Sequence, residues 1–402
     1  MIRKLHLKNF LSYKDVTISF NEFNVIVGAN ASGKTNLTKA LNTLRGLISG
    51  GFNSIEDFDA FMENTFHKNS PETEPMVFEI EVENPVDIAL ADKRKIHFAK
   101  HHYYLELQYS VGVVKEWYKA WEKGQAKPYT ILQRENGKAK FAGDKYDPAH
   151  SLTNEVDKTT MENIMFQPLV GKAASPFLMM IIQAFCDFLI TYNLIPHEIV
   201  RPFVSRNQKV VSVTGSNLAG VLQFYKDHKP EVIDSINEIL SRNIPNFVSV
   251  DTKPLGISRN YLFFVKEADG KDYMLNELSE GTDVFVALVA AMVTSQYVEL
   301  PEHFTGIMIV EEPEKNLHPQ LMEELVALAK SLTGKFQVIM TTHSSDLVSH
   351  LQPEDLILLD KNAVGSRVKR VSQTKDVKKY LEEFSLDQIW LNNDLNGGTI
   401  NG

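Results

Sequence analysis

The stretch that decides the fold is Gly28-Ala29-Asn30-Ala31-Ser32-Gly33-Lys34-Thr35. It follows the apolar run at residues 23–27 and opens a helix-like segment that continues from Asn36. Two glycines let the backbone turn so tightly that successive N–H groups point into one concavity, at which the positive end of the new helix is also aimed. A polyphosphate fits such a concavity. The sequence therefore predicts a phosphate-binding loop between a buried strand and a helix.

The residue types in this loop indicate how a nucleotide would be held. Lys34 is expected to reach the β and γ phosphates, and the Thr35 hydroxyl is expected to ligate Mg²⁺, a hard cation that prefers oxygen ligands. A chance match is the alternative, and the flanking strand and helix argue against it. We therefore predict ATP and Mg²⁺ as cofactors. The predicted ATP-binding residues here are Gly28, Asn30, Ala31, Ser32, Gly33, Lys34, Thr35 and Asn36.

Composition bounds the class of protein. The 402 residues can form one large or two ordinary domains, and a hydrophobic content of 43% is ample for a buried core. A net charge of −9, from 42 basic and 51 acidic residues, argues against a free-standing nucleic-acid binder that works by charge alone. The local basic clusters at residues 93–102 and 369–379 are expected to be solvated faces more often than binding sites.

Other features favour a cytoplasmic protein. The single cysteine, Cys186, excludes an internal disulfide and suits a reducing compartment. The N-terminal residues alternate like a strand and lack the apolar core of a signal peptide. The most apolar segment, residues 176–195, is interrupted by Gln183 and Asp187, so a buried or partner-facing helix is expected there rather than a membrane span.

Hydrophobic periodicity gives a coarse map of the elements. Residues 1–27 indicate two or three short strands, and the helix after the phosphate loop extends to about Ile48. No internal repeat and no long heptad run is present. Further strands are predicted at residues 76–83, 97–109, 129–133, 247–251 and 261–265, and helical patterns at residues 161–197, 217–240 and 284–298.

A second chemical segment lies in the C-terminal third. Residues 306–310 are fully apolar and are followed by Glu311, Glu312 and Pro313. This is the form of a buried parallel strand that delivers acids to its C-terminal edge, where open α/β sheets bind ligands. Glu311 is expected to hold the Mg²⁺ shell, and Glu312 to position and deprotonate the attacking water. The alternative is that both acids pair with nearby basic groups.

Two more segments follow the same logic. The apolar run at residues 336–340 ends in Thr341-Thr342-His343, and a histidine at a strand tip can hydrogen-bond a γ-phosphate and sense its loss. Ser279 and Gly281, before the helical pattern at 284–298, combine an N-cap with a helix N-terminus and so predict a second anion-binding site. Each feature alone is commonplace, since N-capped helices and structural histidines are frequent.

Taken in order, the four motifs resemble the ABC-type ATPase heads of the RecF, SMC and OLD-nuclease group. Residues 7–13, Leu-Lys-Asn-Phe-Leu-Ser-Tyr, are similar to the strand and loop that open those heads. The resemblance implies an α/β fold: a P-loop NTPase of the ABC-head type with an N-terminal antiparallel β subdomain, a parallel-sheet core and a β-rich and helical insert. The core is expected as two halves, residues 1–130 and 270–402, around a mainly helical insert or lid at residues 131–269.

The resemblance also assigns roles. In such heads the serine equivalent to Ser279 contacts the γ-phosphate bound by the other subunit, so hydrolysis requires a head-to-tail homodimer. The segment 314–319, with His318, is then expected at the dimer seam. Two departures stand out: Glu311 replaces the usual aspartate, and no glutamine loop is evident, although Gln108 and Gln133 are candidates.

The compact length of the chain indicates which kind of ATPase head it resembles. Without heptads it lacks the arms of SMC proteins, and no acidic metal cluster of an OLD nuclease follows His343. It is most similar to compact AAA-family ATPases of bacterial phage-defence operons such as Septu and PARIS, which control a separate, often nuclease, effector. The tail at residues 384–391 is similar to that group, and its Trp390 and Leu391 are either a partner anchor or packed on the chain itself. The alternatives are a RecF-like ATPase that binds DNA in repair, and a transporter subunit, which the large insert disfavours.

Overall fold

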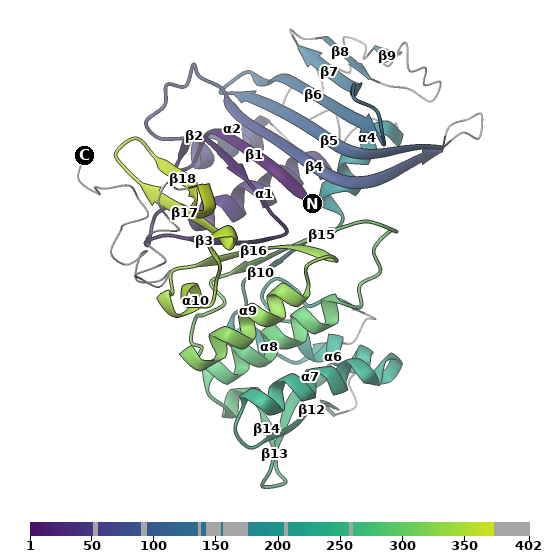
Figure 1. Ribbon diagram of the computed structural model, residues 1–402, viewed down its shortest axis with the longest axis vertical. Helices are drawn as coiled ribbons and strands as arrows, with labels where there is room; N and C mark the ends of the chain where they lie inside the picture. The colour runs from purple at the N-terminus through teal and green to yellow at the C-terminus, as the bar shows by residue number, and fades with distance from the viewer. Residues whose placement is uncertain are drawn as a thin grey trace. The chain divides into compact units, whose positions relative to one another are not determined.

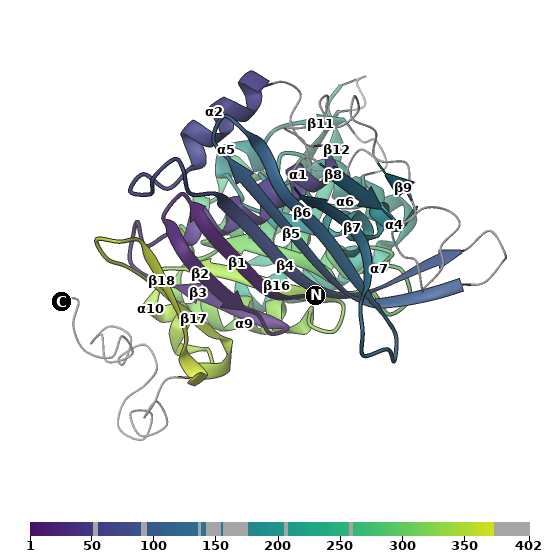
Figure 2. The same cartoon turned by 90° about the horizontal axis from the view of Figure 1, so that it is seen from above.

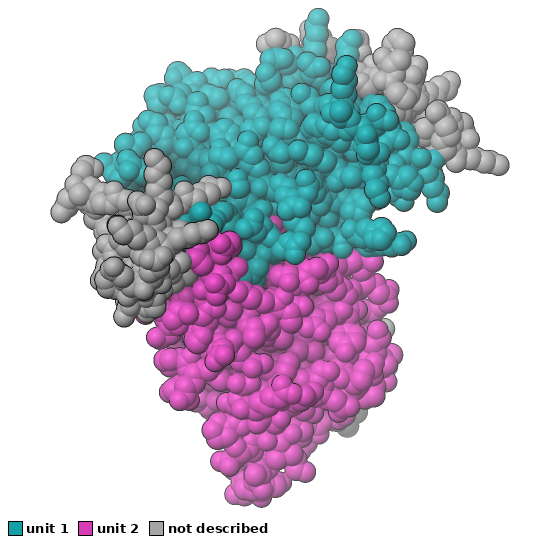
Figure 3. Space-filling view, viewed as in Figure 1, with its two compact units in different colours: residues 1–189, 301–307, 357–374 teal, residues 190–300, 308–356, 375–402 magenta. Residues whose placement is uncertain are grey.

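The computed structural model describes residues 1–50, 55–89, 95–135, 138–141, 154–155, 176–204, 208–256 and 260–373 (Figure 1). The chain divides into two compact units (Figure 3). The first comprises residues 1–189, 301–307 and 357–374, and the second residues 190–300, 308–356 and 375–402. The two units are groups of residues that pack together. They do not test the predicted division into two core halves and an insert, which stays a prediction. The tail residues 384–391 lie outside the described residues, as do residues 93 and 94 of the first basic cluster and residues 374–379 of the second.

The first unit contains an antiparallel sheet, with the order β2-β1-β4-β5-β6-β7-β8-β9 in the described part of the chain. Figure 2 shows its central strands side by side. Alternating side chains such as Leu5, Leu7 and Ile80 are fully buried, so one face of the sheet faces the core. The strands are β1 (Ile2–Phe10), β2 (Tyr13–Ser19), β4 (Met76–Ala89), β5 (Lys95–Gln108), β6 (Gly112–Glu122), β7 (Tyr129–Glu135), β8 (Lys138–Phe141) and β9 (Asn154–Glu155).

The hydrophobic pattern of the sequence does not predict strand β6, because an acid lies on the core face of this strand and tryptophans lie on its other face. Its core face carries the fully buried Glu116, whereas Trp117 and Trp121 lie on the opposite, half-buried face. On that face the Trp117 ring stacks on Tyr104 of β5, with centroids 5.2 Å apart and an interplanar angle of 4°. Cross-strand aromatic pairs of this kind stabilise a sheet without a polar–apolar pattern.

The remaining elements of the first unit position the loop that follows β3 (Phe23–Val27). Every residue of β3 is buried, as expected for a core strand, and β3 neighbours β17 (Leu356–Lys361), which pairs with β18 (Ser366–Arg370). Helix α1 (Lys34–Ser49) buries its apolar stripe, which includes Leu37, Leu41 and Leu44. The unit also contains α2 (Ile55–Thr65), α4 (Pro176–Ile181) and the π-helical turn η2 (Ile182–Cys186).

The helix predicted over residues 161–197 is wrong in its second part. Residues 161–175 lie outside the described residues, and residues 176–186 are helical. The chain then forms β10 (Leu189–Tyr192) and the short helix α5 (Pro196–Ile199). The β-branched and aromatic run Ile190-Thr191-Tyr192 favours a strand, and β10 takes a place beside β15 (Gly306–Glu311).

The second unit is built around three neighbouring strands and a buried helix. Strands β10, β15 and β16 (Phe336–Thr342) lie in that order, and every residue of β16 is buried. Helix α8 (Glu280–Ser295) is buried from Asp283 to its end. The unit also contains β11 (Phe203–Val204), α6 (Leu218–His228), α7 (Pro230–Asn243), β12 (Phe247–Pro254), β13 (Asn260–Glu267), β14 (Asp272–Met274), α9 (Met322–Ser331) and α10 (Ser345–Ser349).

Several predicted elements of the second unit are confirmed. The helical pattern at 217–240 corresponds to two helices, α6 and α7, because Pro230 begins a new helix at its first position. The predicted strands at 247–251 and 261–265 correspond to β12 and β13. Among the described residues, no helix combines the length and apolar character needed to span a membrane.

The core face of the first unit's sheet carries a buried ion pair, which we use to test the fold. The Arg134 guanidinium lies 3.8 Å from Glu116, and the Tyr103 hydroxyl donates to Glu116 at 2.9 Å. Arg134→Met would leave a buried carboxylate without its countercharge, so we expect a loss of about 3–5 kcal/mol of unfolding free energy in urea. The control is Lys115→Met, which breaks the exposed Lys115–Glu135 pair and is expected to cost less than about 1 kcal/mol. Equal losses would contradict the buried placement.

Candidate nucleotide-binding site

The loop after β3 has the backbone of an anion-binding nest. Ala31 and Gly33 adopt left-handed conformations, with φ of 64° and 115°. The Ser32 N–H donates to the Ala29 carbonyl at 3.2 Å, and α1 begins at Lys34. Such a backbone directs several N–H groups and the helix N-terminus into one concavity. The structure thus gives the predicted loop the local geometry expected of it.

Neighbouring chain segments enclose both glycines of the loop. A Cβ atom at Gly28 would lie 2.3 Å from the Leu359 carbonyl oxygen of β17. At Gly33 it would lie 2.5 Å from Ser366 Oγ and 2.7 Å from Ser12 Oγ. Both spaces are too small for any side chain, so glycine is required by contact at both positions and by the positive φ at Gly33.

The polar groups of the loop fit a phosphate. Lys34 is only 5% exposed, and its Nζ donates to the carbonyls of Gly28 at 2.7 Å and Ala29 at 3.2 Å, which holds the ammonium over the loop. The buried Ser32 hydroxyl has no hydrogen-bond partner among the described residues, as expected of a group that awaits a ligand. Thr35, next along α1, is exposed and open to a cation.

Three side chains that sequence reasoning did not assign hold the loop in place. The Tyr13 hydroxyl donates to the Gly33 carbonyl at 2.8 Å, and burial raises the pKa of this phenol, which therefore stays neutral. Ser366 of β18 donates to the Ser32 carbonyl at 2.6 Å. Ser12 accepts from Asn36 Nδ2 at 2.9 Å. Ser12 and Tyr13 belong to the opening segment that carries the family resemblance, whereas Ser366 has no sequence signal.

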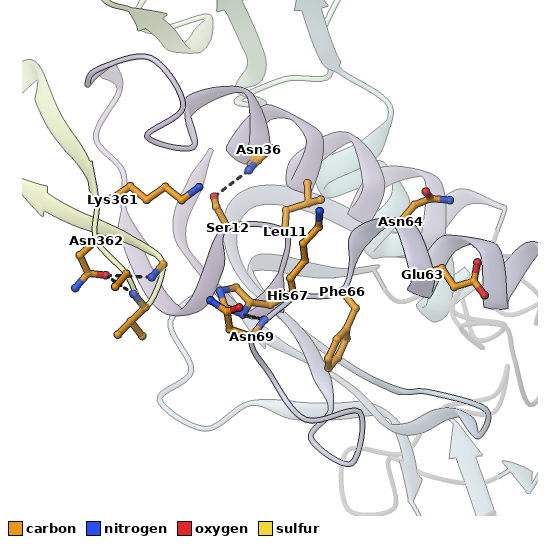
Figure 4. Close-up of a pocket in the computed structure, with 14 residues that line it drawn as sticks. Leu11, Ser12, Asn36, Glu63, Asn64, Phe66, His67, Asn69, Lys361 and Asn362 are labelled. Atoms are coloured by element: carbon orange, nitrogen blue, oxygen red, sulfur yellow. Dashed lines mark hydrogen bonds between the residues drawn. The ribbon is translucent and has the colours of Figure 1, made fainter.

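A cavity of about 380 Å³ opens beside the loop (Figure 4). Ser12 and Asn36 form its edge, and the other walls come from the end of α2 and the β17–β18 turn. His67, in the first of these walls, is buried, and desolvation lowers its pKa, so the ring is neutral at neutral pH. The cavity is of the size that small-molecule ligands occupy. It borders Asn36, the residue that follows Thr35 at the start of α1.

In the second unit, Glu311 and Glu312 lie at the C-terminal end of β15. Glu311 accepts a hydrogen bond from Asn193 Nδ2 at 2.9 Å. Glu312 has a positive φ of 42°, and its N–H donates to the Thr341 carbonyl of β16 at 2.9 Å. A left-handed conformation in a non-glycine residue costs about 1–3 kcal/mol and is concentrated at functional sites.

The structure places His343 beside Glu312. His343 follows β16, and its Nδ1 lies 3.8 Å from Glu312 Oε1 and 3.3 Å from Glu314 Oε1. Lys315 also pairs with Glu312, at 2.7 Å. The acids therefore do have local partners, which for Glu312 include the exposed Lys315 and the predicted His343.

The predicted signature residues begin α8 and contact the loop that follows Glu312. Ser279 is the N-cap and accepts from the Thr282 N–H at 3.2 Å. A Cβ atom at Gly281 would lie 2.2 Å from the Asn316 carbonyl oxygen, so glycine permits this close approach. In the same turn, burial raises the pKa of Asp283 to about 7, and one of its carboxyl oxygens has no hydrogen-bond partner among the described residues.

The site residues thus form two sets, each assembled within its own unit. Gly28 to Asn36 form the first set, and Ser279, Gly281, Glu311, Glu312 and His343 the second. The exposed His318 caps the short 3₁₀ turn at residues 319–321, and Gln108 and Gln133 lie in β5 and β7. Among the described residues no cluster of three or more metal-ligating side chains occurs. Mg²⁺ usually takes only one or two protein ligands, so the predicted pair of Thr35 and Glu311 stays a prediction.

Two family models match the chain. One, described as "AAA ATPase domain", matches residues 1–164. The other, described as "AAA domain, putative AbiEii toxin, Type IV TA system", matches residues 210–349. Both models describe AAA-type ATPase domains, so these two segments support an AAA-type ATPase.

One curated relative and two solved structures are also similar to this chain. The chain is 23% identical over 175 residues to the "Retron Vc95 probable ATPase" of Vibrio cholerae serotype O1 biovar El Tor. That match covers 42% of this chain and only 34% of the relative's length. The fold is similar to an SMC head bound to the C-terminal winged-helix domain of ScpA, with a TM-score of 0.54, 15% identity, and coverage of 92% and 97% of the two chains.

A second SMC head, with an extended coiled coil and bound to the C-terminal domain of ScpA derived from Pyrococcus furiosus, gives a TM-score of 0.53. Its identity is 12%, and coverage is 95% of this chain and 99% of that chain. At such identities the likeness concerns the fold alone. The predicted fold class, an α/β P-loop NTPase of the ABC-head type, is confirmed.

Gly33→Ala tests the phosphate loop. The added methyl group meets Ser366 and Ser12 and forces φ away from 115°, so we expect affinity for a fluorescent ATP analogue to fall at least about tenfold. The matched control is Gly124→Ala, which also has a positive φ, 86°, but nothing within 4 Å of the added methyl group. The control should bind like the parent protein. Unchanged affinity of Gly33→Ala would show that nucleotide is held elsewhere.

Proposed function

We propose that this chain binds and hydrolyses ATP with Mg²⁺ and acts as a nucleotide-dependent homodimer switch. We further propose that it is the sensor or regulatory ATPase of a bacterial antiviral defence system and controls a separately encoded, nuclease-like effector. The observation that carries the ATPase proposal is the enclosed glycine loop with Lys34 held over it and the unpartnered Ser32 hydroxyl beside it. The retron name of one relative supports the defence role.

Each residue has a role in this proposal. Lys34 and the loop N–H groups hold the β and γ phosphates, and the cavity beside Asn36 receives the nucleoside. Thr35 and Glu311 would hold Mg²⁺, which would supply positive charge to neutralise the phosphates. Glu312 orients the attacking water and takes its proton, and His343 donates a hydrogen bond to the γ-phosphate.

The second copy of the chain completes the reaction. Ser279, at the N-terminus of α8, contacts the γ-phosphate that the other copy holds, because a helix N-terminus and a serine hydroxyl both favour an anion. Binding of ATP therefore closes the dimer, and loss of the γ-phosphate opens it. The open and closed states give an effector two surfaces to distinguish.

Glu312→Gln separates binding from hydrolysis. The amide keeps the size of the side chain but cannot accept the water's proton, so the turnover number should fall about 10²-fold while ATP affinity is kept. Phosphate release measures the rate, and mass photometry with ATP and Mg²⁺ should show a trapped dimer. The control, Glu302→Gln, alters an exposed acid and should leave both unchanged. Normal turnover in Glu312→Gln would remove Glu312 as the base.

The Glu312→Gln protein also tests whether the partner is an effector protein or DNA. The Glu312→Gln protein is purified from cells that express its native operon, with Lys34→Ala, which should not bind ATP, as the reference. ATP-dependent recovery of a second polypeptide supports control of an effector. A dimer that forms alone and retains duplex DNA in a salt-sensitive manner instead supports a RecF-like DNA-binding ATPase.

Ser279→Arg tests the proposed seam. A long cation at the start of α8 blocks approach of the second copy but leaves the phosphate loop of its own chain intact. We expect ATP binding to the monomer within about twofold of the parent, and no ATP-dependent dimer in the Glu312→Gln background. Analytical ultracentrifugation measures the dimer, and Ser331→Arg, at the end of α9, is the control. Undiminished dimerisation would exclude Ser279 from the seam.

A further inference from the structure

A buried carboxylate stands beside the proposed catalytic pair and has no part in the roles assigned so far. Glu314 lies two residues after Glu312, and its side chain is only 6% exposed. Its Oε1 accepts a hydrogen bond from Thr342 Oγ1 at 2.7 Å and another from the His343 N–H at 2.9 Å. Both donors lie where β16 ends. Glu314 therefore ties the loop after β15 to the backbone on which His343 is mounted.

The second oxygen of Glu314 is sealed from solvent and has no hydrogen-bond partner among the described residues. A buried carboxylate with one unmatched oxygen costs free energy, and a neutral or apolar residue would fill the same space more cheaply. Stability alone therefore does not account for an acid at this position. A negative charge fixed beside a catalytic histidine does account for it.

The histidine ring lies within reach of this charge. His343 Nδ1 is 3.3 Å from Glu314 Oε1, nearer than the 3.8 Å to Glu312 Oε1. The His343 side chain is 43% exposed, so the ring extends from the buried carboxylate to the surface. A carboxylate that accepts from one ring nitrogen fixes the tautomer and the orientation of an imidazole.

We propose that Glu314 is the positioning residue of His343: it accepts the Nδ1–H of the ring and stabilises the imidazolium, whose Nε2–H is thereby directed toward the γ-phosphate. This inference rests on the proposed ATPase function. Glu314 touches no substrate itself and acts through the histidine. The contact between Gly281 and Asn316 fixes the far side of the same loop, so the carboxylate is held from two directions.

The kinetic test is a double-mutant cycle. Glu314→Gln keeps the side-chain volume but removes the charge, and a neutral amide is the weaker acceptor, so kcat should fall about tenfold with KM for ATP within about twofold. In the His343→Ala background, Glu314→Gln should cause no further loss, because the carboxylate acts only through the ring. Glu323→Gln, an exposed acid at the start of α9, is the control. Independent, multiplying losses in the double variant would overturn the proposal.

A second measurement needs no turnover, and its first result comes from the unaltered protein. The ¹⁵N NMR signals of the His343 ring in the unaltered protein, assigned by comparison with His343→Gln, report which nitrogen carries the proton. We expect a protonated Nδ1, and a smaller protonated fraction at Nδ1 in Glu314→Gln. A ring with Nε2 alone protonated in the unaltered protein would overturn the proposal. A protein that shows the expected ring signals but never hydrolyses ATP would refute the proposed function and leave the positioning role standing.

Discussion

The first unit depends on one steric constraint, the absence of side chains at Gly28 and Gly33. The Leu359 carbonyl and the hydroxyls of Ser366 and Ser12 occupy the space that Cβ atoms would need. These neighbours come from the β17–β18 hairpin and the turn after β1, which are more than 340 residues apart in sequence. The loop that presents N–H groups to an anion therefore forms only when both ends of the chain are folded around it.

A comparable constraint shapes the second unit. The loop after β15 is fixed at one side by the close approach of Gly281 to Asn316 and at the other by the bonds from Thr342 and His343 to Glu314. Glu312 lies between the end of β15 and these attachments, in a left-handed conformation that an unrestrained glutamate would leave. The start of α8 and the end of β16 thus jointly determine where the predicted base points.

Much of this architecture follows from local sequence, and the exceptions have physical causes. The strand, glycine loop and helix at residues 23–49, and the apolar strands that end in Glu311 and Thr342, carry their own patterns. Strand β6 does not, because its core face holds Glu116 in a buried ion pair while tryptophans cover the other face. Ser366 and Glu314 were missed for a different reason: their roles come from long-range contacts that no local pattern records.

Two features beside the end of β15 cost free energy of folding, and they favour a functional rather than a structural origin for the loop that follows this strand. The strained backbone of Glu312 and the half-satisfied, buried Glu314 each lower stability, and both lie within four residues of the strand end. A site under selection for stability alone would have glycine at the first position and an apolar side chain at the second. Their shared contact with His343 gives one reason for both, since the strain aims one carboxylate and the burial fixes another near the same ring nitrogen, Nδ1.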